Sequence, residues 1–347
     1  MKVMNIGGQL IGPTYKPFII AEMSGNHNQS LERALEIVDA AAEAGAHAIK
    51  LQTYTADTMT VKGAYTIKDQ NSLWNGRELY ELYQQAYTPW DWHKVIFDRA
   101  KSHGMLAFSS PFDASAVDFL ETLDVPAYKI ASFENTDHPL LRKVAQTGKP
   151  VIMSTGIATL ADIDEAVRVL QDNGCTSLAI LKCTSTYPAT PSTSNIATIP
   201  HMARLFEDVQ VGLSDHTMGI GVAVAAVALG ATIVEKHFTL SRADGGVDSA
   251  FSLEPDELKA LVKETGRAAL SLGRIQYGVQ KAEKNSKKFK RSVYAVKDIL
   301  PGESLSDQNL RVIRPGDGLE PKYFDTLLGK TAKQKIKAGT PLSWELV

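Results

Sequence analysis

Two histidines at the ends of apolar segments are the first residues in this sequence that could do chemistry. His216 follows an apolar run at residues 209–215, and His237 lies near the end of another at 232–239. Two neutral imidazoles without cysteine leave coordination positions open for water and substrate oxygens. The pair therefore predicts a metal centre used as a Lewis acid, with Mn²⁺ as the expected ion and Mg²⁺ or Co²⁺ as alternatives.

Two lysines within other apolar segments provide a second chemical signal. Lys50 and Lys129 stand where a lone buried charge would be costly. Hydroxyl side chains end several of the same segments. Fixed ammonium groups and hydroxyl donors together suit a small ligand that carries both carboxylate and phosphate. The predicted anion site comprises Lys50, Ser109, Lys129, Ser132, Ser185 and Ser214.

Eight short apolar runs must position these residues. Such runs, separated by amphipathic segments, indicate buried strands that alternate with helices in a parallel sheet. Eight units over about 250 residues predict a (β/α)8 TIM barrel. The alternative, an open doubly wound sheet, is disfavoured because no Gly-x-Gly-x-x-Gly follows the first run. The runs are residues 18–23, 46–53, 105–111, 127–132, 150–155, 178–185, 209–215 and 232–239.

A barrel would gather these side chains at one end, because chemistry in this fold lies at the C-terminal ends of the strands. Period-two alternation puts Glu235 and His237 on one face of the last run and Lys236 on the other. Lys236 is therefore expected to point toward the helices. His27 lies in a loop at the catalytic end and stays unassigned.

Composition excludes several classes of protein. The 347 residues include 37 Lys and Arg against 39 Asp and Glu, a net charge of −2, which argues against a nucleic-acid binder. The two cysteines form neither a disulfide framework nor a zinc pattern. No signal peptide is evident, and no apolar run reaches the ~20 residues that cross a bilayer. The sequence predicts a soluble cytoplasmic protein that binds neither nucleic acid nor membrane.

The character of the sequence changes after residue 272, where the predicted barrel domain (1–272) ends. Residues 273–291 are rich in lysine and poor in apolar side chains, which is typical of a solvated basic linker. An electropositive strip near an anionic substrate is the alternative. Residues 292–347 return to short strand-like runs and tight turns, so they are expected to form a separate small domain.

Six motifs in order resemble the sialic acid synthase family, most closely its pseudaminic acid branch. They are IAEMSGNHN at 20–28, IKLQ at 49–52, YKIAS at 128–132, CTSTYP at 183–188, GLSDHT at 212–217 and EKHFT at 235–239. The tail, with NLRVIRPG at 309–316 and KAGTPL at 337–342, resembles the antifreeze-like (SAF) domain of these enzymes. The resemblance covers nearly the whole chain.

This resemblance implies that phosphoenolpyruvate (PEP) condenses with an amino-sugar aldehyde to give a nine-carbon 2-keto acid, with release of phosphate by C–O cleavage. In the pseudaminic branch the sugar is 2,4-diacetamido-2,4,6-trideoxy-L-altrose. The alternative is an N-acetylneuraminic or legionaminic acid synthase that uses N-acetylmannosamine or a related sugar. Ser185 stands where an Asn is common in the N-acetylneuraminic branch, and Gly-Val-Asp-Ser at 246–249 replaces its Gly-Pro-Asp-His.

The resemblance also implies roles for individual residues. His216 and His237 would hold the metal, which polarises the aldehyde, and Glu22 would be catalytic by orienting a sugar hydroxyl or the water. The predicted anion site would hold PEP. The partner's tail would deliver an arginine in a domain-swapped homodimer. The residues expected to face the sugar are Gln52, Tyr187, Asp248 and Arg314.

Two other functions stay open at this point. A Schiff-base aldolase could use Lys50, Lys129 or Lys236 as its nucleophile on the same barrel. A non-catalytic binding protein could use the tail to engage a surface or polymer.

Overall fold

The computed structural model describes residues 3–70 and 72–347. The chain divides into two compact units, and the boundary in the sequence falls between Gly273 and Arg274. No helix in the described ranges is both long and apolar enough to cross a bilayer.

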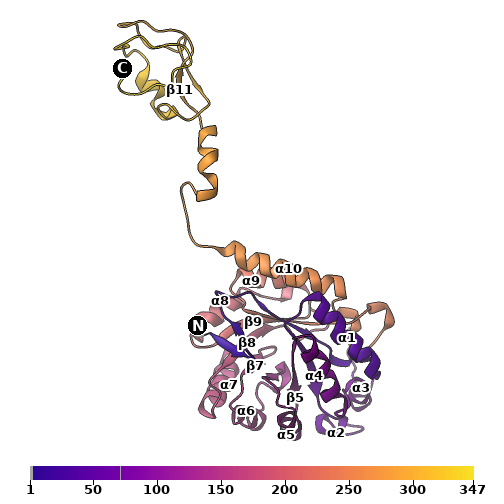
Figure 1. Ribbon diagram of the computed structural model, residues 1–347. Helices are drawn as coiled ribbons and strands as arrows, with labels where there is room; N and C mark the ends of the chain where they lie inside the picture. Colours follow the sequence, from indigo (N-terminus) through magenta and orange to yellow (C-terminus); the bar gives the residue numbers. More distant parts are fainter. Residues whose placement is uncertain (1–2, 71) are drawn as a thin grey trace. The chain divides into compact units, whose positions relative to one another are not determined.

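The first unit is a closed barrel of eight parallel strands (Figure 1). Each of the eight predicted runs contains one of these strands, and the last strand pairs with the first, so the predicted TIM barrel is confirmed. In spatial order the strands are β3 (Phe18–Glu22), β4 (Ala48–Thr53), β5 (Leu106–Pro111), β6 (Tyr128–Ile130), β7 (Val151–Ser154), β8 (Leu178–Cys183), β9 (Gln210–Asp215) and β10 (Ile233–His237).

Helices alternate with the strands, and local sequence sets their ends. Ser30 caps α1 by accepting the backbone N–H of Arg33, and Gly45 ends that helix at φ 89°. Asp113 caps α5 in the same way. The longer helices are α1 (Leu31–Ala44), α4 (Trp92–Ser102), α5 (Ala114–Thr122), α6 (His138–Ala145), α7 (Leu160–Asp172), α8 (Thr198–Leu205), α9 (Gly221–Ala228) and α10 (Pro255–Leu272).

Two parts of the barrel unit were not predicted from the sequence. An antiparallel hairpin, β1 (Met4–Ile6) and β2 (Gln9–Ile11), precedes the barrel. The long connection between β4 and α4 contains the short helices α2 (Ala56–Met59) and α3 (Leu79–Ala86). The hairpin strands and α2 are too short to show a pattern of two or of 3.6 residues. The eight residues of α3 do show helical spacing, at Leu79, Leu82, Tyr83 and Ala86, which the prediction from sequence did not use.

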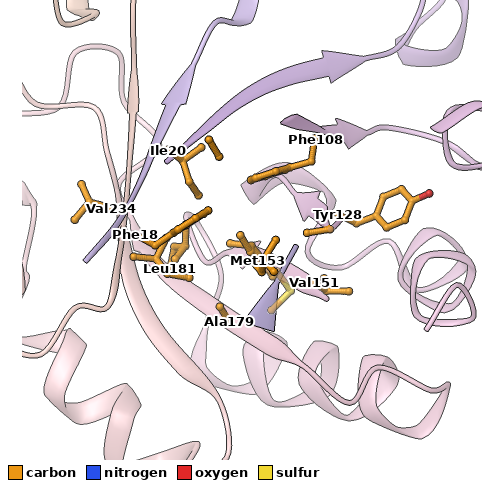
Figure 2. Packing of buried hydrophobic residues seen from close by; sticks show 14 of the residues in the cluster. Phe18, Ile20, Phe108, Tyr128, Val151, Met153, Ala179, Leu181 and Val234 are labelled. Carbon is orange, nitrogen blue, oxygen red and sulfur yellow. The ribbon is translucent and has the colours of Figure 1, made fainter. Parts of the chain in front are cut away.

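Apolar side chains fill the interior of the barrel unit, and Phe18, Phe108 and Met153 are among the buried residues of Figure 2. One glycine controls how closely β9 approaches β10. A Cβ at Gly212 would lie 2.4 Å from the carbonyl oxygen of Ile233, so only glycine fits there. This close approach brings the ends of β9 and β10 together, where both candidate metal ligands are attached.

The second unit has its own small core and pairs β11 (Ser292–Ala295) with β12 (Leu310–Ile313) in antiparallel register. A short helix, α11 (Phe324–Leu327), covers part of that core. The basic segment predicted as a linker belongs to this unit from Arg274 onward. It contains an exposed 3-10 helix, η6 (Lys281–Phe289).

Candidate active site

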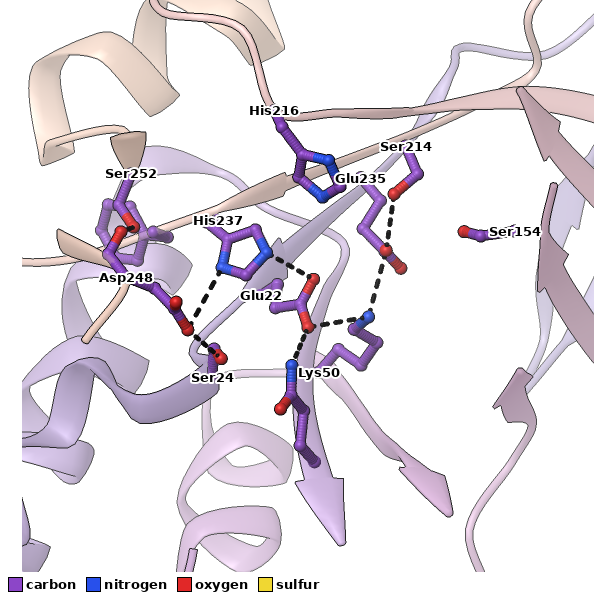
Figure 3. Close-up of polar contacts among 12 residues, drawn as sticks. Glu22, Ser24, Lys50, Ser154, Ser214, His216, Glu235, His237, Asp248 and Ser252 are labelled. Atoms are coloured by element: carbon purple, nitrogen blue, oxygen red, sulfur yellow. Dashed lines mark hydrogen bonds and ion pairs between the residues drawn. The ribbon is translucent and has the colours of Figure 1, made fainter. Parts of the chain in front are cut away.

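Four buried ionisable side chains, called here the ion-pair network, meet at the C-terminal ends of the barrel strands, and Figure 3 shows three of them, Glu22, Lys50 and Glu235. Lys50 Nζ lies 3.0 Å from Glu22 Oε1 and 3.0 Å from Glu235 Oε1. Lys129 Nζ lies 3.6 Å from Glu235 Oε1 and donates to Ser154 Oγ at 2.7 Å. The members Glu22, Lys50, Lys129 and Glu235 come from β3, β4, β6 and β10, so the closed barrel is what brings them together.

The network sets the ionisation of its members. Burial alone would raise the pKa of Glu22, but its electrostatic interactions with His237 and Lys50 and the hydrogen bond from Gln52 outweigh burial and hold that pKa well below its usual range. Burial would lower the pKa of Lys50, yet Glu22 and Glu235 raise it above its ordinary value. Lys129 differs, because burial lowers its pKa more than the Glu235 charge raises it.

The two candidate metal ligands face each other beside this network. The ring centroids of His216 and His237 are 5.4 Å apart. His216 Nδ1 lies 2.9 Å from the carbonyl oxygen of Thr184, which places its proton on Nδ1 and leaves the Nε2 lone pair free. His237 Nδ1 is buried without a hydrogen-bond partner among the described residues, and His237 Nε2 lies 3.3 Å from Glu22 Oε2.

This donor set fits a divalent cation. Burial lowers the pKa of His237, which favours the neutral imidazole that a metal requires. For His216 the effect of burial is outweighed by Cys183, which raises its pKa, so a cation bound there would displace a proton. The described part of the chain has no group of three or more His, Cys, Asp or Glu side chains placed to hold a metal ion. Two imidazoles would therefore leave the other positions to water and substrate oxygens, as an open catalytic site needs.

A cavity of about 460 Å³ connects the histidines with the ion-pair network. Tyr187 lines this cavity, and its ring centroid lies 4.4 Å from the ring centroid of His216. Gln52 donates to Glu22 Oε1 at 2.8 Å, and Asp248 accepts a hydrogen bond of 2.5 Å from Ser24. The predicted residues that line this cavity are Glu22, Lys50, Gln52, Lys129, Ser132, Ser185, Tyr187, Ser214, His216, His237 and Asp248.

Two predicted site residues do not lie in this cavity. Ser109 stands in register with Leu51, not with Lys50, and therefore faces the helices. Its hydroxyl lies 2.6 Å from that of Thr53, and we remove it from the anion site. Arg314 follows β12 in the second unit, so its role toward the sugar stays a prediction.

Two residues left aside by the sequence analysis have structural contacts. Lys236 faces the helices as alternation predicts, and its Nζ lies 2.8 Å from Asp215 Oδ2. His27 Nε2 lies 3.2 Å from Thr88 Oγ1, and burial lowers the pKa of His27 to about 4. Neither residue lines the cavity.

The structure adds lining residues that the predicted site lacked. Glu235 could have been predicted from the sequence, because it shares a strand face with His237 and because two buried lysines need carboxylates as counter-charges. Ser154 ends the fifth run and binds Lys129. Glu134 and Trp74 lie in irregular segments, where no period points to them.

Glu134 leads to a prediction about stability and pH. Burial raises its pKa from 4.5 to about 7, so ionising it costs more in the folded chain than in the unfolded chain. The protonated Glu134 side chain therefore contributes fully to the free energy of unfolding below about pH 4.5, and this contribution is lost as the pH rises to about 7. We expect Glu134→Gln to be more stable than the parent at pH 8, by up to about 3 kcal/mol, with no gain at pH 4.5.

Urea unfolding at both pH values measures the stability of Glu134→Gln against the parent, with the exposed Glu43→Gln as control. Equal stability of Glu134→Gln and parent at pH 8 would contradict it.

Comparison with known proteins gives two family matches along the chain. The NeuB family matches residues 37–277, and the SAF domain matches residues 290–347. The chain is 46% identical over 330 residues to the pseudaminic acid synthase of Campylobacter jejuni. This alignment covers 94% of this chain and 95% of that protein. It is 36% identical to the N,N'-diacetyllegionaminic acid synthase of the same species, over 93% of this chain and 97% of that protein.

A solved structure supports the same relationship. The crystal structure of an N-acetylneuraminic acid synthetase from Leptospira borgpetersenii, in complex with citrate, matches with a TM-score of 0.74 at 32% identity. The match covers 82% of this chain and 95% of that one.

Proposed function

This chain is a member of the NeuB family, and from that premise we propose that it is a pseudaminic acid synthase. It would condense PEP with 2,4-diacetamido-2,4,6-trideoxy-L-altrose and release phosphate. The observation that carries the proposal is a buried lysine pair, Lys50 and Lys129, beside two facing imidazoles, His216 and His237. Joining an enol phosphate to an aldehyde requires an anion site next to an electrophile site.

The lysines hold PEP in this proposal. Lys50 and Lys129 bind its carboxylate and phosphate, with hydroxyls of Ser132, Ser154 and Ser214 as further donors. Glu235 fixes both ammonium groups before the substrate arrives. The site then needs little rearrangement when PEP carbon 3 attacks the aldehyde carbon.

Glu22 serves the second half of the reaction. Carbon–carbon bond formation leaves positive charge on carbon 2 of the former PEP, and one water must add there before phosphate leaves by C–O cleavage. The low pKa of Glu22 keeps its carboxylate ionised, so it can orient that water or a sugar hydroxyl. Gln52 and Lys50 hold Oε1 of the same carboxylate in place.

We propose Mn²⁺ as the ion that His216 and His237 would hold. A bound divalent cation would supply Lewis acidity toward the aldehyde oxygen, together with positive charge that the ion-pair network, with two ammonium groups and two carboxylates, lacks. The free Nε2 of His216 supports this assignment, as does Nδ1 of His237, which makes no hydrogen bond within the described ranges and lies 4.0 Å from Asp248 Oδ2.

The substrate decides between pseudaminic acid and its alternatives. We expect phosphate release from PEP with the diacetamido-trideoxy sugar and a product mass equal to pseudaminic acid. N-acetylmannosamine should give at least tenfold lower kcat/KM. The reverse preference would instead favour an N-acetylneuraminic acid synthase, and the absence of any sugar-dependent phosphate release would refute the proposal.

The lowered pKa of Lys129 favours a second candidate, a Schiff-base aldolase. The two mechanisms respond oppositely to metal removal and to reductive trapping. We expect EDTA to abolish turnover and Mn²⁺ to restore it, and we expect borohydride with substrate to leave the protein mass unchanged. A covalent adduct together with EDTA-resistant activity would establish the aldolase.

We also propose a homodimer in which the second unit of one chain completes the site of its partner. Ile275 and Tyr277 are 92% and 93% exposed in the single chain, and burying them against a partner would stabilise the pair. Arg314 would then reach the sugar from the partner's tail.

Complementation tests this arrangement. Arg314→Ala should weaken sugar use at least tenfold, with little change in the KM for PEP, and His237→Ala should be inactive. In a mixed dimer, one site combines an intact barrel with an intact Arg314 from the other chain. We therefore expect activity to return when the two variants are unfolded, mixed and refolded together. No recovery, with mixed dimers present by mass spectrometry, would show that Arg314 acts within its own chain.

A further inference from the structure

The lining of the cavity has two chemically different parts. Lysines, carboxylates and hydroxyls surround the predicted PEP site. The connection between β4 and α4 contributes two polar residues, Asp69 and Ser72, and a mainly apolar group called here the apolar wall, which we define as Met59, Ile67, Trp74, Leu79, Leu82 and Tyr83. None of these six side chains carries a charge at neutral pH, so the wall is suited to contact carbon and not phosphate.

Trp74 is the member of the apolar wall with the most defined orientation. Its Nε1 donates to the carbonyl oxygen of Val247 at 3.0 Å, which ties the wall to the loop after β10. That loop is held in turn by the hydrogen bond from Ser24 to Asp248. The indole therefore has its one polar group satisfied, and its apolar surface is available to the cavity.

A chain of ring contacts relates Trp74 to the reaction centre. Its ring centroid lies 5.7 Å from that of Tyr187, which lies 4.4 Å from His216 and 6.4 Å from His237. A sugar whose aldehyde lies at the two histidines would extend past Tyr187 toward Trp74. Substituents remote from the aldehyde would therefore meet the apolar wall.

The chemistry of the wall distinguishes between candidate sugars. A methyl group, at carbon 6 of a deoxy sugar or on an acetamido substituent, gains from contact with the indole. A hydroxymethyl group against the indole face would lose water without gaining a hydrogen bond from the indole, because Trp74 Nε1 already donates to Val247. Apolar pockets of this kind discriminate by about 10- to 200-fold.

We propose that Trp74 is a specificity-determining residue that selects a 6-deoxy, doubly acetamidated sugar over a hydroxylated one. This inference rests on the proposed function and names the residue that reads the end of the sugar remote from the aldehyde.

Steady-state kinetics with both sugars test the inference. For Trp74→Ala we expect kcat/KM for the diacetamido-trideoxy sugar to fall at least tenfold, mainly through KM, and that for N-acetylmannosamine to change less than threefold. Trp74→Phe keeps an apolar ring and should retain most of the preference. Leu73→Ala is the matched control, because Leu73 is 49% exposed on the same connection and does not line the cavity. An unchanged KM for PEP verifies that each variant keeps its anion site.

The outcomes separate this inference from the proposed function. Equal losses for both sugars, or an unchanged preference in Trp74→Ala, would overturn the role of Trp74 and leave the synthase assignment standing. If the parent converts neither sugar, the synthase assignment is wrong. Calorimetric titration of the two open-chain sugar alcohols then decides about Trp74, which is supported only if Trp74→Ala selectively weakens binding of the deoxy compound.

Discussion

Replacing His237 with alanine is expected to lower kcat at least 1,000-fold and to leave the barrel folded. The side chain lies at a strand end and lines the cavity, and its Nδ1 makes no hydrogen bond to any described residue, so its removal enlarges the cavity and leaves the pairing of β10 with its neighbours in place. Its removal takes away one of the two imidazoles that would hold the cation, and preorganised electrostatic groups of this kind account for several kcal/mol of a reaction barrier.

Three measurements check this expectation. Phosphate release gives kcat, thermal unfolding reports the fold, and calorimetric titration with Mn²⁺ reports metal binding. His201→Ala is the matched control, since His201 is an exposed residue of α8 outside the cavity. Normal turnover by His237→Ala would remove the metal assignment and, with it, the proposed basis of aldehyde activation.

Among the substitutions proposed for this protein, Glu235→Gln should cause the largest decrease in the free energy of unfolding. Glu235 Oε1 faces both lysines of the ion-pair network and accepts from Ser214 at 3.1 Å. The substitution keeps the shape of the side chain but leaves Lys129 without its carboxylate. Removing one partner from a buried ion pair costs about 3–5 kcal/mol, and we expect a loss in that range.

An added anion should reverse part of this loss. Phosphate can take the place of the missing carboxylate beside the two ammonium groups, so millimolar phosphate should stabilise Glu235→Gln more than it stabilises the parent. Urea unfolding with and without phosphate measures both effects. The control is Glu264→Gln, which removes an exposed pair with Arg267 and should cost less than about 1 kcal/mol. A loss that small for Glu235→Gln would mean that the lysines do not depend on this carboxylate.

The sequence predicted the barrel well because each strand carries its own signal. Apolar runs bounded by turn residues mark all eight strands, and the rule that chemistry lies at strand ends then selects most of the cavity. Alternation placed Lys236 outside correctly. Alternation would also have excluded Ser109 from the anion site, but only with knowledge of how β5 is aligned with β4. The sequence of one strand does not give that register.

The rest of the site depends on contacts that only the folded chain makes. Glu134 lies in a 3-10 segment, and its raised pKa comes from burial by residues distant in sequence. Trp74 lies in the part of its connection that precedes α3, where no regular period marks it. The orientation of its ring is set by a hydrogen bond to Val247, which is 173 positions away along the chain. Local patterns cannot reveal such partners.

Closure of the barrel between its first and last strands has a consequence for biosynthesis. His237 stands in register with Glu22, so this candidate catalytic carboxylate gains its imidazole neighbour only when the two ends of the barrel meet. A nascent chain emerging from the ribosome therefore carries Glu22 and Lys50 long before any competent centre exists. Fragments that stop before β10 should be inert toward metabolites, which makes assembly of this catalyst all-or-none.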